Sequence, residues 1–398
     1  MTQLARRLDA LTESQTIAMA RKSRELKAAG IDVISLSLGE PDFTTPEPIK
    51  SAAIAAITNN FSYYTHVSGY LELREAICKK FLRDNKLQFN PDQIVVSTGA
   101  KQSIANAVLA LLNPGDEVLV PSPFWVSYIE IIKLAEGRPV IIPTPIEHDF
   151  KLQPEQLESA IGSKTKLLLF SSPCNPTGTV YTKEDLTALA EVLLKHPQVY
   201  VISDEIYEHI TFEGSHASMA HIKALSERVI TINGVSKGFA MTGWRGGIMA
   251  ASKDIAMACD KIQGQITSAT CSITQKAMHA AMELDVDTYI RPMREAFLKR
   301  RNLALEILSA VPGFKTNRPQ GAFYIYPQVD ALFGKKHGTH VIKNATDLSN
   351  YLLEKAHVAL VPGAAFGDDR YLRFSYATSD NLLIEALHRV QDAVCQLK

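Results

Sequence analysis

Short apolar segments alternate with helical patterns along the middle of the chain, and this alternation restricts the possible folds more than any other feature. Helical patterns separate the apolar segments, as in TGAKQSIANAVLALL, which ends at the stop signal NPGD. Strands separated by helices form βαβ units, so we predict an α/β fold on a largely parallel sheet covered on both faces. The segments predicted as strands are 94–97, 117–120, 166–170, 199–203 and 229–232.

The character of the sequence changes near residue 285. TYIRPMREAFLKRRNLALEILSAV predicts one long amphipathic helix that could connect two domains, and the segments after it predict a smaller α+β domain. The first forty or so residues lack the strand–helix alternation, so we expect them to pack on that second domain. We predict a large domain of residues 47–290 and a small domain of residues 1–46 plus 291–398, in line with a chain of 398 residues.

The composition excludes several classes of protein. Lys and Arg together number 42, as do Asp and Glu, and this balance argues against nucleic acid or an acidic membrane as a partner. No apolar run approaches the roughly 18–20 residues that span a bilayer, and the N-terminus has no signal-peptide pattern. The five cysteines are scattered without a C-x-x-C pair, so we expect a soluble cytoplasmic protein with reduced thiols.

Three common binding motifs are missing from the sequence. There is no G-x-G-x-x-G for a dinucleotide and no G-x-x-x-x-G-K-[ST] for a nucleoside triphosphate. There is also no H-E-x-x-H or comparable ligand cluster, so we expect no metal site.

The sequence GVSKG at residues 234–238 has two competing interpretations. It matches the G-x-S-x-G nucleophile elbow of serine hydrolases, follows a predicted strand, and reads as a strand-to-helix turn. In this interpretation Ser236 is the nucleophile, and His357 or His388 is the nominal base. No HGGG-type oxyanion segment accompanies the motif. The neighbouring Lys237 offers an amine and a different chemistry.

Polar residues follow neighbouring predicted strands at the edge where open α/β sheets bind ligands. Together they supply an amide, an acid, a phenol, an amine, a cation and a helix N-terminus. This set meets the needs of pyridoxal 5′-phosphate: a lysine for its aldehyde, an acid for its ring nitrogen, and a cation with helix amides for its phosphate. The residues are Asn175, Asp204, Tyr207, Ser236, Lys237 and Arg245, with Gly99, Ala100 and Lys101 opening a helix.

Eight motifs in order along the whole chain resemble the class-I aminotransferase family, in the branch of prokaryotic-type aspartate aminotransferases. The resemblance implies a fold-type I pyridoxal-phosphate transferase, with a large domain around a mostly parallel sheet and a smaller α+β domain. The motifs are SLSLGEPDF, YTHVSGYLELREAI, STGAKQ, PSPFWVSY, SSPCNPTG, SDEIYEHI, SKGFAMTGWR and LRFSYATS.

The resemblance implies roles for three catalytic residues. Lys237 matches the lysine that forms the Schiff base with the cofactor and then moves the substrate's Cα proton. Asp204 matches the acid bound to the pyridine nitrogen, and Tyr207 matches the phenol that donates to the ring oxygen O3′.

The resemblance also implies the residues that hold the cofactor. Asn175 matches a ligand of O3′, and Trp125 matches the ring that stacks on the cofactor. Tyr64 matches a phenol that reaches the phosphate of the partner subunit, which implies a homodimer. Many relatives carry a serine where this chain has Gly234, so one phosphate hydroxyl is expected to be missing or replaced by water. The matching phosphate ligands within the chain are Ser236, Arg245 and the amides of Ala100 and Lys101.

Substrate binding follows from the same resemblance. Arg373 matches the arginine that clamps the α-carboxylate, with Asn175 and Trp125 beside it, and Gly39 matches a backbone contact on a mobile segment. The distal carboxylate is read in this branch by a lysine and by small hydroxyls. Those positions correspond here to Lys101, Ser14 and Thr16.

These matches predict transamination between L-aspartate and 2-oxoglutarate by a ping-pong route. Within the same fold, the alternatives are a prephenate or aromatic aminotransferase and a β-lyase. A serine hydrolase acting through Ser236 and a catalytically silent protein of this fold are the alternatives from other classes.

Overall fold

The computed structural model describes residues 4–12 and 15–398, and a seven-stranded sheet forms its centre. The strand order is β2-β8-β7-β6-β5-β3-β4. The strands from β7 to β4 pair in parallel, whereas β8 runs antiparallel to both β2 and β7. The strands are β2 (Ile94–Thr98), β3 (Glu117–Ser122), β4 (Arg138–Pro143), β5 (Thr165–Ser171), β6 (Tyr200–Asp204), β7 (Val229–Gly234) and β8 (Gly246–Ala250).

All five predicted strands are confirmed, as β2, β3, β5, β6 and β7. The prediction missed β4 and β8 for identifiable reasons. Strand β4 contains Pro139 and Pro143, which signal a loop in most contexts, but it lies at the edge of the sheet, where missing N–H donors are tolerated. Strand β8 begins with two glycines and follows a turn, so it carries a weak strand pattern.

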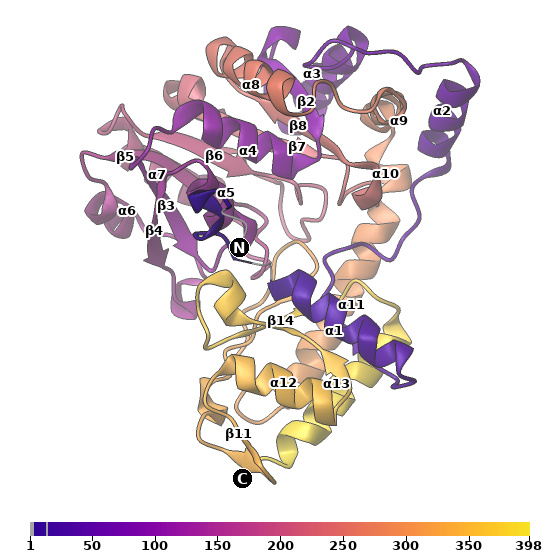
Figure 1. Ribbon diagram of the computed structural model, residues 1–398, viewed down its shortest axis with the longest axis vertical. Helices are drawn as coiled ribbons and strands as arrows, with labels where there is room; N and C mark the ends of the chain where they lie inside the picture. Colours follow the sequence, from indigo (N-terminus) through magenta and orange to yellow (C-terminus); the bar gives the residue numbers. More distant parts are fainter. Residues whose placement is uncertain (1–3, 13–14) are drawn as a thin grey trace.

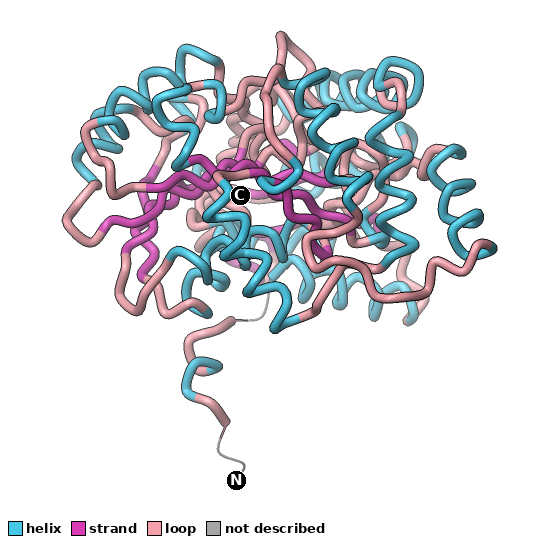
Figure 2. The backbone as a smooth tube through the Cα atoms, turned by 90° about the horizontal axis from the view of Figure 1, so that it is seen from above, coloured by secondary structure: helices cyan, strands magenta, loops and turns pink. Residues whose placement is uncertain are grey.

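Helices cover both faces of the sheet, as predicted (Figure 2). Alternate strand residues point to opposite faces, so every strand except the edge strand β4 contributes to two separate cores. One face carries α4 (Ala100–Leu111), α5 (Ser127–Leu134) and α8 (Lys253–Ile266). The other carries α3 (Leu71–Asn85), α6 (Pro154–Ala160), α7 (Lys183–Leu194) and α9 (Ser272–Glu283).

The single long helix predicted after residue 285 is wrong in one respect, because the structure has two helices there. A short α10 (Val286–Tyr289) ends at Ile290, and α11 (Arg291–Ser309) begins directly after it. Pro292 lies in the first turn of α11, where a missing N–H costs no helical hydrogen bond. The longer helix extends from the sheet region toward the lower part of the molecule in Figure 1, as expected of a connector.

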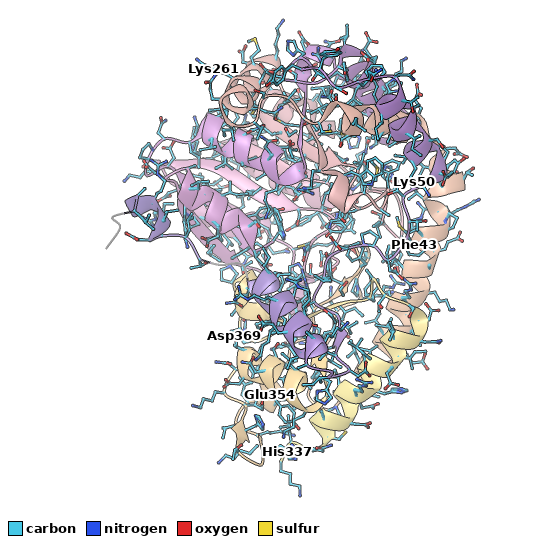
Figure 3. All side chains as sticks on the ribbon, turned by 45° about the vertical axis from the view of Figure 1, so that its right-hand side comes forward. Phe43, Lys50, Lys261, His337, Glu354 and Asp369 are labelled. Carbon is cyan, nitrogen blue, oxygen red and sulfur yellow. The ribbon has the colours of Figure 1, made fainter. Side chains whose placement is uncertain are left out.

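The N-terminal segment packs on the C-terminal part of the chain. Helix α1 (Gln15–Ala28) leads to β1 (Ile34–Ser35), which pairs in parallel with β12 (Val358–Ala359). Farther along, Phe43, labelled in Figure 3, packs edge-on against Phe297 of α11, with 5.4 Å between ring centroids. The division into residues 47–290 and residues 1–46 plus 291–398 stays a prediction. Residues near the start of the chain depart from it, because Thr12 donates two hydrogen bonds to Glu130 of α5 in the sheet region.

The C-terminal part is a smaller α+β unit (lower half of Figure 1). Its three-stranded antiparallel sheet has the order β13-β14-β9. The polar stretch FGKKHGTHVIKNATD forms a small hairpin and then enters α12. The elements are β9 (Tyr324–Ile325), β10 (Lys336–His337), β11 (His340–Val341), α12 (Ala345–Lys355), β13 (Val361–Pro362), β14 (Leu372–Ser375) and α13 (Asp380–Cys395). The remaining helix, α2 (Glu47–Thr58), precedes α3 in the chain. Across the described residues, no helix has the length and apolar character needed to cross a bilayer.

A buried ion pair connects α3 to the segment after β6. Lys80 and Glu208 form a salt bridge with side chains that are each 3% exposed. Asn85 accepts a hydrogen bond from the Lys80 ammonium at 2.8 Å and donates to Glu208 at 2.6 Å. Burial alone would raise the pKa of Glu208, but the charges of Lys80, His209 and His216 together outweigh it and hold that pKa well below its ordinary value. Lys80 makes the largest of these contributions to the charged state of Glu208.

Lys80→Met is expected to lower the free energy of unfolding by about 3–5 kcal/mol, because it leaves the Glu208 carboxylate buried without a positive partner. Urea unfolding followed by circular dichroism measures this change. Lys79→Met is the matched control on the exposed face of the same helix, with an expected change within about 0.5 kcal/mol.

The double variant Lys80→Met/Glu208→Leu should recover much of this loss, because it removes both charges together. Equal instability of the single and double variants would show that the pair contributes through packing and not through charge.

Candidate active site

A cavity of about 500 Å³ lies at the carboxyl ends of β5, β6 and β7. The small α+β unit and the N-terminal segment also contribute to its wall. Twelve of the residues predicted for the site line this one cavity, although they come from segments far apart in the sequence. They are Thr16, Gly39, Ala100, Lys101, Trp125, Asn175, Asp204, Tyr207, Ser236, Lys237, Arg245 and Arg373.

Lys237 follows the end of β7 and projects its amine into the cavity. Its Nζ atom donates a hydrogen bond to the carbonyl oxygen of Gly39 at 2.5 Å. The same atom lies 5.6 Å from the centroid of the Tyr207 ring. Burial lowers the pKa of this amine to about 8. A substantial share of the amine is therefore neutral and nucleophilic in mildly alkaline solution.

Asp204 is the last residue of β6, and its carboxylate is buried. The hydroxyl of Tyr128 donates to Oδ2 at 2.6 Å, and the amide of Ile206 donates to Oδ1 at 3.3 Å. Burial raises the pKa of Asp204 to about 6. The carboxylate is therefore ionised at neutral pH, and a cation beside it in the cavity would stabilise its buried charge.

Arg373 lies on β14, and two hydrogen bonds hold its guanidinium. One Nη atom donates to Oδ1 of Asn175 at 2.9 Å, and the other donates to the carbonyl oxygen of Ser37 at 2.6 Å. Its Nε atom is buried and has no hydrogen-bond partner. Arg373 therefore keeps unused donor capacity in a cavity wall, as a carboxylate-binding residue requires.

Positive groups meet at the N-terminus of α4. Gly99 precedes the helix with φ +85°, and a Cβ atom on it would collide with the guanidinium of Arg245. Burial and the charge of Arg245 both lower the pKa of Lys101, which lies in the first turn. The free N–H groups of the helix add to these cations, so this end of the cavity suits a phosphate group.

Gly234 lies in a crowded backbone environment. It is the last residue of β7, and a Cβ atom on it would be 2.7 Å from the carbonyl oxygen of Gly246. A serine at this position would force β7 and the start of β8 apart. Ser236 lies two residues farther along and lines the cavity.

The remaining predicted residues differ in position. The Nζ atom of Lys101 is 5.0 Å from the centroid of the Trp125 ring. Thr16, in the first turn of α1, lines the cavity, whereas Ser14 lies outside the described residues. Tyr64 does not line the cavity within its own chain, and its side chain is 96% exposed.

Two tyrosines of the site were not predicted from the sequence. Tyr128 holds Asp204, and Tyr324 contacts both Tyr207 and Arg373. The spacing of Tyr128 three residues after Trp125 was a usable signal, because it places both rings on one side of a helical turn. Tyr324 had no comparable signal, since its position depends on pairing between strands β9 and β14.

The strand-to-helix turn predicted at GVSKG is wrong. After β7 the chain passes through turns and a short 3-10 helix (Thr242–Trp244), and then enters β8. A nucleophile elbow needs the missing helix and a nearby base. Among the described residues, no histidine lines the cavity that contains Ser236.

The residues present fit pyridoxal 5′-phosphate. Lys237 is an amine of lowered pKa that can react with an aldehyde, and Asp204 is a buried carboxylate for a ring nitrogen. Arg245 and the start of α4 can hold a phosphate. The Nε atom of Arg373 has no hydrogen-bond partner, so it can donate to a substrate carboxylate as well.

Comparisons with known proteins agree with this fit. The model of the family "Aminotransferase class I and II" matches residues 31–390. A protein of Rickettsia bellii called "Probable aspartate/prephenate aminotransferase" is 49% identical over 396 residues, covering 99% of both chains. A bifunctional aspartate and glutamate/aspartate-prephenate aminotransferase of Petunia hybrida is 46% identical, covering 99% of this chain and 83% of that protein.

Solved structures show the same similarity. An aspartate aminotransferase from Rhizobium meliloti superposes with a TM-score of 0.97 at 41% identity, covering 100% of both chains. The Thermus thermophilus aspartate aminotransferase with maleate has a TM-score of 0.93 at 40% identity, covering 99% of this chain and 100% of the other. The chain belongs to the class I and II aminotransferases, and it is a pyridoxal-phosphate-dependent enzyme with the fold-type I architecture.

Proposed function

We propose that the enzyme transfers the amino group of L-aspartate to 2-oxoglutarate, which gives oxaloacetate and L-glutamate. The observation that carries this proposal is the presence of Arg373 and Lys101 in the same cavity as Lys237, in addition to the phosphate-side cation Arg245. Two cations in addition to Arg245 suit a substrate with two carboxylates. Maleate, the ligand of the similar Thermus thermophilus structure, is also a dicarboxylate.

Prephenate is the second candidate substrate. It also carries two carboxylates, and the names of the Rickettsia bellii and Petunia hybrida relatives include it. The same pair of cations could bind it, so we propose it as an alternative amino acceptor for this chain.

Lys237 is the proposed catalytic base. Pyridoxal phosphate supplies a carbonyl that takes up the amino group and a ring that withdraws electrons from the substrate's Cα atom. Lys237 would anchor the cofactor through Nζ, and once the amino substrate has freed that atom it would remove the Cα proton. The hydrogen bond to Gly39 shows that Nζ can also reach the cavity wall on the N-terminal segment.

Asp204 and Tyr207 would set the electronic state of the cofactor. The Asp204 carboxylate, supported by Tyr128, would face the ring nitrogen and keep it protonated. Tyr207 and Asn175 would donate hydrogen bonds to the ring oxygen. Asn175 also accepts from Arg373, so it would connect the cofactor to the residue that binds the α-carboxylate.

The other proposed cofactor ligands would bind the phosphate of the cofactor or stack on the face of its ring. Ser236, Arg245 and the amides of Ala100 and Lys101 would hold the phosphate. Trp125 would stack on the ring. Tyr64 of the partner subunit would complete the phosphate site in a homodimer, which is consistent with the exposure of this residue in the single chain.

The proposed substrate ligands surround the same space. Arg373 and Asn175 would bind the α-carboxylate, and the main chain of Gly39 would contact the substrate. Lys101 would bind the distal carboxylate together with the hydroxyls of Thr16 and Ser14. All five cysteines have free thiols, which is consistent with the proposed cytoplasmic location.

The rate at which pyridoxal phosphate attaches to the cofactor-free protein should increase as the pH rises through about 8 and then level off. The lowered pKa of Lys237 explains this, because only the neutral amine attacks the aldehyde. Stopped-flow absorbance gives the rate, with Nα-acetyl-lysine amide as the reference amine for titration of the aldehyde itself. Lys237→Ala should give no borohydride-stable adduct. A rate that keeps rising beyond pH 10 would contradict the lowered pKa.

Lys101→Ala is expected to reduce kcat/KM for aspartate by roughly 10–100-fold, because it removes a charge-assisted hydrogen bond to the distal carboxylate. The value for alanine, which has no second carboxylate, should change far less. Steady-state kinetics with both amino donors, and with prephenate and 2-oxoglutarate as acceptors, measures the difference.

Lys166→Ala is the matched control for this variant. Lys166 lies over the ring of Tyr200 with its Nζ atom 5.0 Å from the centroid, the same separation as between Lys101 and Trp125, and it does not line the cavity. A similar loss for aspartate and alanine in Lys101→Ala would show that Lys101 serves the cofactor and not the distal carboxylate.

Because the active unit is proposed to be a homodimer, sedimentation equilibrium of the protein should give a particle of twice the chain mass of 43.8 kDa.

Tyr64→Phe should weaken cofactor retention by roughly 2–10-fold without dissociating the dimer, because it removes one hydrogen bond. Dialysis followed by absorbance measures retention. Tyr63→Phe, at a neighbouring side chain that is 83% exposed, is the control. A monomer that retains its cofactor would exclude the shared site.

A further inference from the structure

Tyr324 is buried where the small α+β unit meets the sheet domain. It lies on β9 and pairs with Ser375 of β14, the strand that also carries Arg373. Its side chain has no exposed surface, yet it lines the cavity. The proposed function assigns no role to Tyr324.

The hydroxyl of Tyr324 contacts two parts of the proposed site. Its oxygen is 2.8 Å from the hydroxyl oxygen of Tyr207, a hydrogen-bond distance. It also packs against Gly39, where a Cβ atom would be only 2.5 Å away. Tyr324 therefore contacts the proposed phenol directly, and it contacts the proposed base through Gly39, which accepts the hydrogen bond from Lys237.

Each of the two hydroxyls has one proton, and this determines the direction of their hydrogen bond. Burial raises the pKa values of both Tyr207 and Tyr324, so both phenols stay protonated near neutral pH. If Tyr207 donates its proton to the cofactor, the proton between the two tyrosines must come from Tyr324. A phenol that accepts a hydrogen bond becomes a stronger donor, because the bonds polarise one another.

The ring of Tyr324 has a second contact. The guanidinium carbon of Arg373 lies 4.6 Å from its centroid and 5.0 Å from that of Phe366. The edges of the guanidinium face Asn175 and the carbonyl of Ser37. Ring contacts and edge contacts together restrict the plane in which Arg373 can bind a carboxylate bidentately.

We propose that Tyr324 is a positioning residue that acts through two others. Its hydroxyl donates to Tyr207, so that the Tyr207 proton points toward the cofactor, and its ring holds the guanidinium of Arg373 for the substrate carboxylate. The inference rests on the roles of Tyr207 and Arg373 in the proposed function. It goes beyond that function because it makes one side chain the connection between cofactor tuning and carboxylate binding.

The pH titration of the holoenzyme's absorbance tests the hydroxyl. In Tyr324→Phe the pH at the midpoint of the bound cofactor's absorbance change should rise by roughly 0.4–1 pH unit. The reason is that Tyr207 becomes a weaker donor and stabilises the negative ring oxygen of the cofactor less. Tyr207→Phe should raise the midpoint at least as much. The double variant should match Tyr207→Phe alone, because Tyr324 acts through Tyr207. Tyr351→Phe is the control, since it removes a buried hydroxyl that bonds to the Ala393 carbonyl away from the cavity.

Steady-state kinetics tests the ring. Tyr324→Phe keeps the ring, so KM for aspartate should change less than about 2-fold. Tyr324→Leu removes it and should raise KM by roughly 2–30-fold through the lost cation–π contact. Thermal unfolding of the cofactor-free proteins checks the fold. If Tyr324→Leu fails to fold, the absorbance titration of Tyr324→Phe alone decides the proposal.

Three outcomes would overturn the inference. An unshifted midpoint in Tyr324→Phe, beside a shifted one in Tyr207→Phe, would reject it while leaving the proposed function in place. Additive shifts in the double variant would show that Tyr324 does not act through Tyr207. An unshifted midpoint in Tyr207→Phe would reject the inference together with the proposed role of Tyr207.

Discussion

The backbone pairing of β5, β6 and β7 is the constraint on which the site depends. Ser171 pairs with Asp204 across β5 and β6, and Asp204 pairs with Ile232 across β6 and β7. Three parallel strands therefore end at nearly the same level, and the segments that follow them meet over one edge of the sheet. This common edge brings together an amide, a carboxylate and an amine that are more than sixty residues apart from first to last.

The charges of the cavity form a second constraint. Lys101, Lys237, Arg245 and Arg373 line it, opposed mainly by Asp204 and Glu40. Such an excess of positive charge in a partly buried space is unfavourable for the isolated chain, because like charges repel and burial removes water. It becomes favourable once a phosphate and carboxylates enter. The repulsion that destabilises the cavity without its ligands is therefore relieved when anions bind, and this relief adds to their affinity.

The sequence predicted the framework and most of the site for a physical reason. Strand periodicity is local, and Asn175, Asp204 and Lys237 follow strands directly, so their meeting could be inferred from the parallel sheet alone. The roles of Arg373 and Trp125 came from a family resemblance and not from spacing. What could not be predicted depends on tertiary context: the edge position that lets β4 contain prolines, the turn and antiparallel β8 after Lys237, and the strand pairing that places Tyr324.

The crowded position of Gly234 has a consequence for how this enzyme can diverge. A side chain there would meet the carbonyl of Gly246 across the β7–β8 ladder, so a hydroxyl cannot be added by a single substitution without moving a strand. A phosphate-binding hydroxyl at this position would therefore need a second change that moves the backbone at Gly246.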